Sequence, residues 1–394
     1  MKKLEVLLAL LGFLSVDRGV TGIAVAQTPG VTATEIKLGQ TKPYSGPASA
    51  YGLQGKAETA YFEMINDNGG INGRKVNLIS LDDAYSPPKT FEQTRRLIEQ
   101  DEVAAIFGTL GSPTNSAIKK YLNGRKIPQL FIVAGASAFA DPEHFPWTIP
   151  GVWIYSDEAK LYAADSLKNT PNAKIAILYS NDDAGRDYAT AFKAGLGAKV
   201  SQIVSELKYE STDPTVDSQV VALATTGADV FFYQATPKFS AQILRRKHLL
   251  GWNAKTYVAA TGSSLASALV PAGLETAQGI ISGAYLKDPD DPRWANDPGY
   301  KEYAAWMDKY LPGTNKSEGL YISGFNNAQV MAKVLEQCGN DLSRENILKQ
   351  ATNLDLERPM LLPGIRYKIS PDDYRPIKNI RLQVFKGDRW MLVD

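Results

Sequence analysis

The sequence predicts an α/β protein made of two similar lobes, each built around a parallel sheet. Short hydrophobic strands alternate with amphipathic helices along most of the chain. The pattern of residues 73–117 recurs at residues 197–241, with ten identical pairs at one constant offset. Both copies end with a hydroxyl residue before a proline, Ser112 in one and Thr236 in the other, which is typical of a helix N-terminus.

The first lobe is expected to span residues 34–153. The strand "EIKLGQT" precedes a helix in "LQGKAETAYFEMINDNGG", where apolar residues recur at helical spacing and two glycines stop the helix. A second strand starts at Lys75, and a second helix follows the prolines at 87–88. The run "VAAIF" predicts a buried strand that leads into the helix opened by Ser112.

The second lobe is expected to span residues 154–284 and to repeat this order. "AKIAILYSND" and "ADVFF" predict strands, and "AGRDYATAFKAGLG" predicts a helix between them. Farther on, "PGYKEYAAWMDKYL" and "SGFNNAQVMAKVLEQCG" predict helices, while "GIRYKI" and "IRLQVFKGDRWMLVD" predict strands that add to the lobe sheets. We assign residues 285–360 to the first lobe and 361–394 to the second, so the chain crosses between the lobes more than once.

Residues 1–26 have the features of an export signal. Two lysines precede an apolar run from about Leu4 to Val16, and Ala24-Val25-Ala26 forms a small-residue cleavage site. A lipid anchor would need a cysteine directly after this signal, but the single cysteine of the chain is Cys338. We therefore expect an exported protein that is free in its compartment and has no internal disulfide.

Composition and motifs argue against several functions. Forty-three basic and 42 acidic residues leave a net charge of +1, without the footprint of a nucleic-acid binder. Neither a glycine-rich phosphate loop nor a metal-binding motif is present, so we expect no cofactor and no metal. A serine hydrolase would need a base beside Ser112 or Ser45, and neither His144 nor His248 lies in such a setting. We expect no catalytic residue.

Ligands of open parallel sheets bind outside the carboxyl ends of the strands. If the two lobes turn these edges toward each other, helix N-termini line a shared cleft. Their free N–H groups favour an anion such as a carboxylate. Capping alone is the alternative role of Ser112 and Thr236, and the two roles are compatible. The loops at these edges are residues 41–52, 108–116, 133–143, 179–188, 234–240 and 259–264.

Three stretches carry a resemblance to a known family. "LGQTKPYSGPASAYGLQGKAETAYFEMINDNGGINGRKVNLISLDDAYSPPKT", "IFGTLGSPTN" and "KIAILYSNDDAGRDYATAFKAGL" resemble the leucine/isoleucine/valine-binding type of periplasmic solute receptor for ABC transporters. The resemblance implies a type I periplasmic binding fold, in which two Rossmann-like lobes are joined by a three-strand hinge and close on a ligand. It also implies a monomer that delivers a small carboxylic acid or amino-acid-like ligand to a membrane ABC permease.

The resemblance also places a ligand site. Residues of the first lobe at the positions that hold the ligand carboxylate include Tyr51 and Ser112, and Tyr155 offers a ring. In the second lobe this sequence departs from the family, because Ala184 and Thr236 stand at aromatic positions and Thr261 stands at the position of an acid. The implied ligand-binding residues are Tyr51, Ser112, Gly135, Ala136, Ser137, Tyr155, Ala184, Thr236 and Thr261.

The missing acid bears on the ligand. Burying an ammonium group without a carboxylate partner costs roughly several kcal/mol. We therefore expect the ligand to be a small carboxylic acid or amide without a free α-amino group. Asp157, Asp182 or Asp183 could instead bind an amine from another direction. Two alternative functions remain open at this point: a ligand-sensing subunit on the same fold, and a serine hydrolase that uses Ser112.

Overall fold

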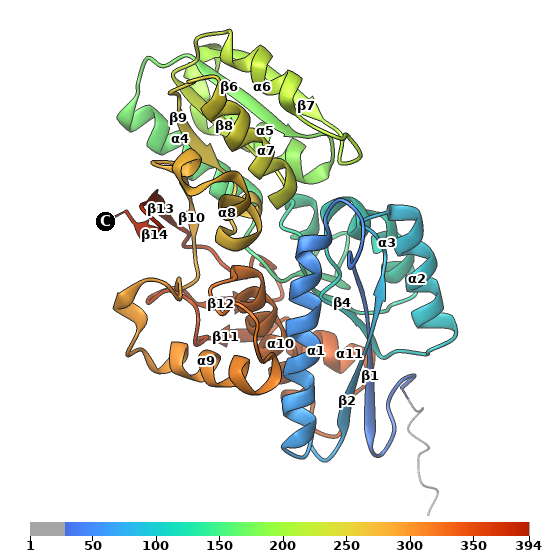
Figure 1. Cartoon of the computed structure of the whole chain (residues 1–394). Coiled ribbons are helices and arrows are strands. Elements are labelled where there is room, and N and C mark those ends of the chain that lie inside the picture. Colours follow the sequence, from blue (N-terminus) through green and yellow to red (C-terminus); the bar gives the residue numbers. More distant parts are fainter. Residues whose placement is uncertain (1–27, 394) are drawn as a thin grey trace, which may run out of the picture.

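The computed structural model describes residues 28–393 and shows two α/β lobes, one above the other in Figure 1. The expected export signal, residues 1–26, lies outside the described residues. None of the helices in the described part of the chain is both long and apolar enough to cross a membrane.

The first lobe holds a five-stranded sheet in the order β2-β1-β3-β4-β5, in which all neighbouring strands are parallel. Its strands are β1 (Glu35–Lys42), β2 (Lys75–Asp82), β3 (Ala105–Phe107), β4 (Gln129–Ile132) and β5 (Thr148–Pro150). Its helices are α1 (Gly52–Asp67), α2 (Pro87–Glu99), α3 (Ser112–Gly124), α9 (Pro298–Tyr310), α10 (Gly319–Cys338) and α11 (Arg344–Ala351).

The second lobe holds a seven-stranded sheet in the order β14-β13-β10-β9-β8-β6-β7. Strands β6 to β10 are parallel to one another, whereas β13 and β14 form an antiparallel hairpin on the edge beside β10. The strands are β6 (Ile175–Ser180), β7 (Ile203–Tyr209), β8 (Val230–Tyr233), β9 (Lys255–Val258), β10 (Ile281–Ala284), β13 (Arg381–Lys386) and β14 (Arg389–Leu392). The helices are α4 (Tyr155–Asn169), α5 (Asp183–Leu196), α6 (Asp217–Ala224), α7 (Pro237–Leu249) and α8 (Val270–Ala272).

The internal repeat of the sequence corresponds to a repeat of topology. The order β2-β1-β3-β4-β5 of the first sheet recurs as β7-β6-β8-β9-β10 in the second. In both lobes the third strand along the chain leads into a helix with proline in its first turn, β3 into α3 and β8 into α7. The predicted fold class, two α/β lobes with parallel sheets, is confirmed.

Three connections join the lobes: residues 151–154, residues 285–287 with the segment that follows them, and residues 370–380. The prediction that all C-terminal strands extend the lobe sheets is correct for β13 and β14. It is wrong for "GIRYKI", because β12 (Tyr367–Ile369) pairs only with β11 (Leu354–Leu356) in a separate two-stranded sheet. These two short strands are close in sequence, and closing a short loop between them costs little entropy.

A buried ion pair connects the first strand, the first helix and the C-terminal third. Lys42 Nζ lies 2.9 Å from Glu58 Oε2, and both side chains are fully buried. Glu58 Oε1 accepts a second hydrogen bond, of 2.9 Å, from Asn327 Nδ2 of α10. Burial raises the pKa of Glu58 and lowers the pKa of Lys42, because it disfavours the charged form of both groups. The attraction between the two groups favours the charged form of each.

We therefore expect Lys42→Ala to destabilise the protein by about 3–5 kcal/mol, because it leaves the Glu58 carboxylate buried without its cation. Denaturant unfolding measures this loss. Lys89→Ala is the matched control, since Lys89 forms an ion pair with Asp82 in which both side chains are about a third exposed. The control should cost less than about 1 kcal/mol. If the two substitutions lowered the free energy of unfolding equally, the buried pair would stabilise the protein no more than the exposed pair does.

Candidate ligand-binding site

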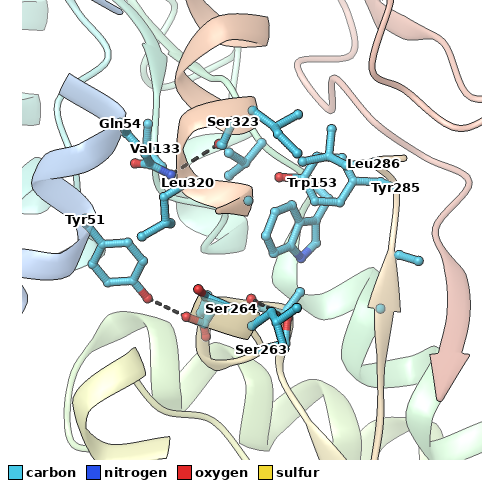
Figure 2. Close-up of a pocket in the computed structure, with 18 of the residues that line it drawn as sticks. Tyr51, Gln54, Val133, Trp153, Ser263, Ser264, Tyr285, Leu286, Leu320 and Ser323 are labelled. Atoms are coloured by element: carbon cyan, nitrogen blue, oxygen red, sulfur yellow. Dashed lines mark hydrogen bonds between the residues drawn. The ribbon is translucent and has the colours of Figure 1, made fainter. Parts of the chain in front are cut away.

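A cavity of about 1210 Å³, part of which is open to solvent, lies between the lobes. Residues of both lobes and of the connection after β10 line it, as Figure 2 shows for the section around Trp153, Tyr285 and Leu320. Its lining includes the residues that follow β3 and β8, where both sheets end. The expectation that a cleft forms at the carboxyl ends of the strands therefore agrees with the position of this cavity.

The N-termini of α3 and α7 meet at this cavity through Ser112 and Thr236. The predicted helix N-terminus at each of these residues is confirmed, but neither hydroxyl caps its helix. Gly111, with a φ of 98°, is the N-cap residue of α3, and Ser112 is already the first helical residue. Thr236 is the N-cap residue of α7, but its side chain makes no capping hydrogen bond. Glycine suits the cap of α3 because other residues rarely adopt a positive φ.

Both hydroxyls instead lack a partner. Ser112 Oγ and Thr236 Oγ1 are buried and form no hydrogen bond with any of residues 28–393. A buried hydroxyl without a partner costs about 1–3 kcal/mol. Together with the free N–H groups of two helix N-termini, they form a polar region that can bind the oxygen atoms of a ligand.

The structure brings six of the nine expected site residues together on the cavity wall and leaves three outside it. Gly135 O accepts a hydrogen bond of 2.8 Å from Tyr155 N, and a Cβ atom on Gly135 would lie 2.7 Å from the ring of Tyr155. Gly135 therefore packs directly against the ring of Tyr155, where a larger residue would collide with the ring. The six lining residues are Tyr51, Ser112, Tyr155, Ala184, Thr236 and Thr261, and the three others are Gly135, Ala136 and Ser137.

Hydrogen bonds between the lobes surround the cavity. Each joins a side chain of the first lobe to an acceptor of the second, so they stabilise the arrangement in which the two lobes face each other. Ser137 has this role in place of lining the cavity. The bonds run from Tyr51 Oη to Thr261 O (2.6 Å, Figure 2), from Ser116 Oγ to Asp183 Oδ2 (2.6 Å) and from Ser137 Oγ to Asp187 Oδ2 (3.1 Å).

Aromatic side chains form much of the wall. The ring of Tyr155 stacks on Tyr188, with 4.6 Å between the centroids and 18° between the planes. Trp153 lies 4.7 Å from Tyr285, centroid to centroid, where two of the connections meet. Among these residues, Trp153, Tyr155 and Tyr285 line the cavity and offer flat apolar surfaces to a ligand.

Glu158 fixes two parts of this wall. Its fully buried carboxylate accepts hydrogen bonds from Trp153 Nε1 at 2.6 Å and from Ala260 N at 2.8 Å. The hydroxyls of Tyr162 and Tyr188 donate to the same carboxylate. Burial raises the pKa of Glu158. The carboxylate thus joins the first connection to the loop after β9, and both Trp153 and Ala260 line the cavity.

The three acids considered for an amine do not line the cavity. Asp182 caps α5 by accepting 2.9 Å hydrogen bonds from Gly185 N and Ser180 Oγ. Asp183 accepts hydrogen bonds from Ser116 and Arg186. Among the described residues, the acid that does line the cavity is Asp288. The sequence analysis did not identify Asp288 or other lining residues such as Gln54, Tyr285 and Leu320. The segment "LKDPDDPRW" around Asp288 has the composition of a solvated turn and gave no signal.

The histidines lie away from the cavity. His144 is exposed and its Nδ1 is 2.9 Å from Asp141 Oδ1, and His248 is also exposed. Neither can accept a proton from Ser112. Among the described side chains, no three His, Cys, Asp or Glu residues gather where they could hold a metal ion.

Two parallel-sheet lobes with a cavity between them and three connections define a two-lobed binding protein. The family model described as periplasmic binding protein matches residues 35–389, and the chain belongs to this family. The expected resemblance to the leucine/isoleucine/valine-binding type is confirmed. A Leu/Ile/Val-binding protein homolog 7 from Brucella suis biovar 1 is 25% identical over 86% of this chain and 86% of its own.

Solved structures show the same fold. A branched-chain amino acid ABC transporter protein from Thermus thermophilus, solved with bound valine, has a TM-score of 0.83 at 16% identity and covers 92% of this chain and 96% of its own. A solute-binding protein of an ABC transporter from R. palustris, solved with benzoate, has a TM-score of 0.78 at 18% identity over 91% of this chain and 95% of its own.

The unpartnered hydroxyl of Ser112 makes a specific prediction about stability. Without ligand, Ser112→Ala should not lower the free energy of unfolding and should raise it by up to about 1–3 kcal/mol, because it removes a buried hydroxyl that has no partner. Ser343→Ala is the control, since Ser343 Oγ caps α11 by accepting from Asn346 N at 3.3 Å. The control should lose about 1 kcal/mol in the same denaturant titration. A loss of that size in Ser112→Ala would mean that its hydroxyl caps α3.

Proposed function

We propose that the protein is an exported receptor that binds a small carboxylic acid or amide without a free α-amino group and delivers it to a membrane ABC permease. It acts in the periplasm as a monomer. One observation carries this proposal. Two buried hydroxyls at facing helix N-termini, Ser112 and Thr236, have no partner among the described residues, and both line the cavity between the lobes.

The carboxylate of the ligand binds where these hydroxyls and the N-termini of α3 and α7 converge. Hydrogen bonds to a charged acceptor contribute about 1.5–3 kcal/mol each, and helix N-termini favour anions. Three or four such bonds supply much of the ~8 kcal/mol of a micromolar complex. Because α3 and α7 belong to different lobes, a carboxylate that binds both holds the lobes together.

The part of the cavity wall at Thr261 is unsuited to an α-ammonium group. Thr261 stands where the family has an acid, its hydroxyl donates to Ala235 O at 3.1 Å, and its carbonyl accepts from Tyr51. Asp182 and Asp183 are used in other contacts. The complex of the R. palustris relative with benzoate, an acid without an amino group, is consistent with such a ligand in this family.

Contacts between the lobes support the proposed delivery to a permease. The lobes are in contact through Tyr51, Ser116 and Ser137, so a closed form presents a surface that the open form lacks. A permease that recognises this surface selects the loaded receptor. The ligand adds to the stability of this form, because it bridges α3 and α7.

Leucine and 4-methylpentanoate differ only in the α-amino group, and this pair tests the ligand class. We expect 4-methylpentanoate, benzoate or phenylacetate to raise the thermal midpoint of the protein more than leucine does. A ligand at 100 times its Kd adds ~2.7 kcal/mol to the folded state. If leucine gave the largest shift, the inference from Thr261 would be wrong.

The best acid of that panel should bind more weakly to Ser112→Ala and to Thr236→Val, by about tenfold or more in each case, since each variant loses a charge-assisted hydrogen bond. Isothermal titration measures the affinities. Ser45→Ala is the control, because Ser45 Oγ donates to Asp82 Oδ2 at 2.6 Å and is not part of the cavity wall. Unchanged affinity in both site variants would contradict the proposed carboxylate position.

A hydrolase that uses Ser112 should cleave an ester or amide, whereas a receptor should not. We expect no turnover of a panel of carboxylic esters and amides, because neither histidine reaches Ser112. Product analysis after incubation with the protein tests this. Hydrolysis that is lost in Ser112→Ala would overturn the receptor function.

A further inference from the structure

The cavity extends well beyond the two helix N-termini. Its second section, which we call the body section, is lined by Trp153, Leu265, Tyr285, Leu286, Leu320 and Trp390. Figure 2 shows Trp153, Tyr285, Leu286 and Leu320 around one side of it. These side chains come from both lobes and from two of the connections, so the cavity has an apolar lining in addition to its polar region at the helix N-termini.

Lys287 and Asp288 are the charged residues on the described wall of this cavity. They follow β10 in the second connection, beside the body section. Lys287 Nζ lies 2.6 Å from Asp297 Oδ1 and donates to Pro359 O at 2.8 Å. Its charge is therefore neutralised by a residue outside the cavity wall.

Asp288 has no such partner. Its Oδ1 accepts from Asp290 N at 3.0 Å and its Oδ2 from Trp390 N at 3.4 Å, and both donors belong to the backbone. No ion pair among residues 28–393 includes Asp288, and Arg293, five residues farther on, pairs with Asp291. Desolvation, with repulsion from Asp290 and Asp291, raises the pKa of Asp288 to about 6. The group is still mostly ionised at neutral pH.

We propose that the ligand is an elongated bipolar molecule, with a carboxylate bound at Ser112 and Thr236 and an ammonium group at its other end bound by Asp288. This inference rests on the proposed function of the same cavity. The apolar middle of the ligand lies in the body section, against Trp153 and Tyr285.

An ammonium group fits this end better than a neutral donor. It supplies three N–H donors and a positive charge, and charge-assisted hydrogen bonds are about twice as strong as neutral ones. Asp290 and Asp291 add to the negative potential around Asp288. An amine at the far end also agrees with the neutral surroundings of Thr261, because only an amine on the α-carbon would lie next to the carboxylate.

The test is isothermal titration of the native protein with pairs of acids of equal chain length. The probes are 6-aminohexanoate, 8-aminooctanoate and 10-aminodecanoate, each against the unsubstituted alkanoate and the ω-hydroxy acid. At one chain length at least, the amino acid should bind about tenfold tighter than both of its partners. Asp288→Asn should reduce this ratio to about one. Asp290→Asn, which removes a neighbouring charge outside the cavity wall, should keep the preference for the amino acid.

Because the ratio compares two ligands on one variant, a loss of folded protein does not change it. Equal affinities of amino and unsubstituted acids at every length would overturn this inference and leave the proposed function intact. A preference that survives in Asp288→Asn, or an equal affinity of the ω-hydroxy acids, would also overturn it. If no carboxylic acid of the series or of the smaller panel binds, the proposed function fails as well.

Discussion

In a parallel sheet every strand ends at the same edge, and this constraint determines where the protein can bind a ligand. In each lobe the helix after the third strand begins at that edge, so α3 and α7 present their N-termini to one cavity. The duplication of the sequence therefore produces two half-sites that face each other. Neither lobe alone surrounds a ligand. The three connections between the lobes keep the two edges opposed, and the cavity is lined by parts of both lobes and of the second connection.

Two buried glutamates hold the elements around this cavity, by different means. Glu58 is paired with Lys42 and accepts from α10, so it joins strand, helix and C-terminal third within one lobe. Glu158 has only neutral donors, and two of them belong to Trp153 and Ala260. Since Glu158 lies in α4 of the second lobe, the ring of Trp153 is fixed to that lobe although its backbone belongs to a connection. Trp153 therefore keeps its position relative to the second lobe, whereas Leu320 on the same cavity belongs to α10 of the first lobe.

The sequence was sufficient for the order of the elements and for the position of the cleft, because both follow from the periodicity of apolar residues and from proline and glycine signals. It was insufficient where a side chain makes a tertiary contact. Ser112 has the sequence setting of a cap, but the preceding Gly111 adopts the positive φ that the turn needs and leaves the hydroxyl free. Ser137 was expected on the ligand and instead contacts Asp187 of the other lobe. The place of Asp288 on the cavity wall could be found only from the structure, because it depends on tertiary contacts and not on the neighbours of Asp288 in sequence.

The selectivity of such a site depends on the groups that it lacks as much as on those that it has. A carboxylate finds donors from both lobes. An α-ammonium beside that carboxylate would find only neutral acceptors at Thr261, whose hydroxyl donates to Ala235 O and whose carbonyl accepts from Tyr51 Oη. Burying an ammonium without a negatively charged partner costs more than the apolar contacts of a small side chain return. Moving the positive charge of a ligand away from its carboxylate removes this cost, and Asp288, which lines the cavity and accepts only backbone hydrogen bonds, is the group that we propose as its partner.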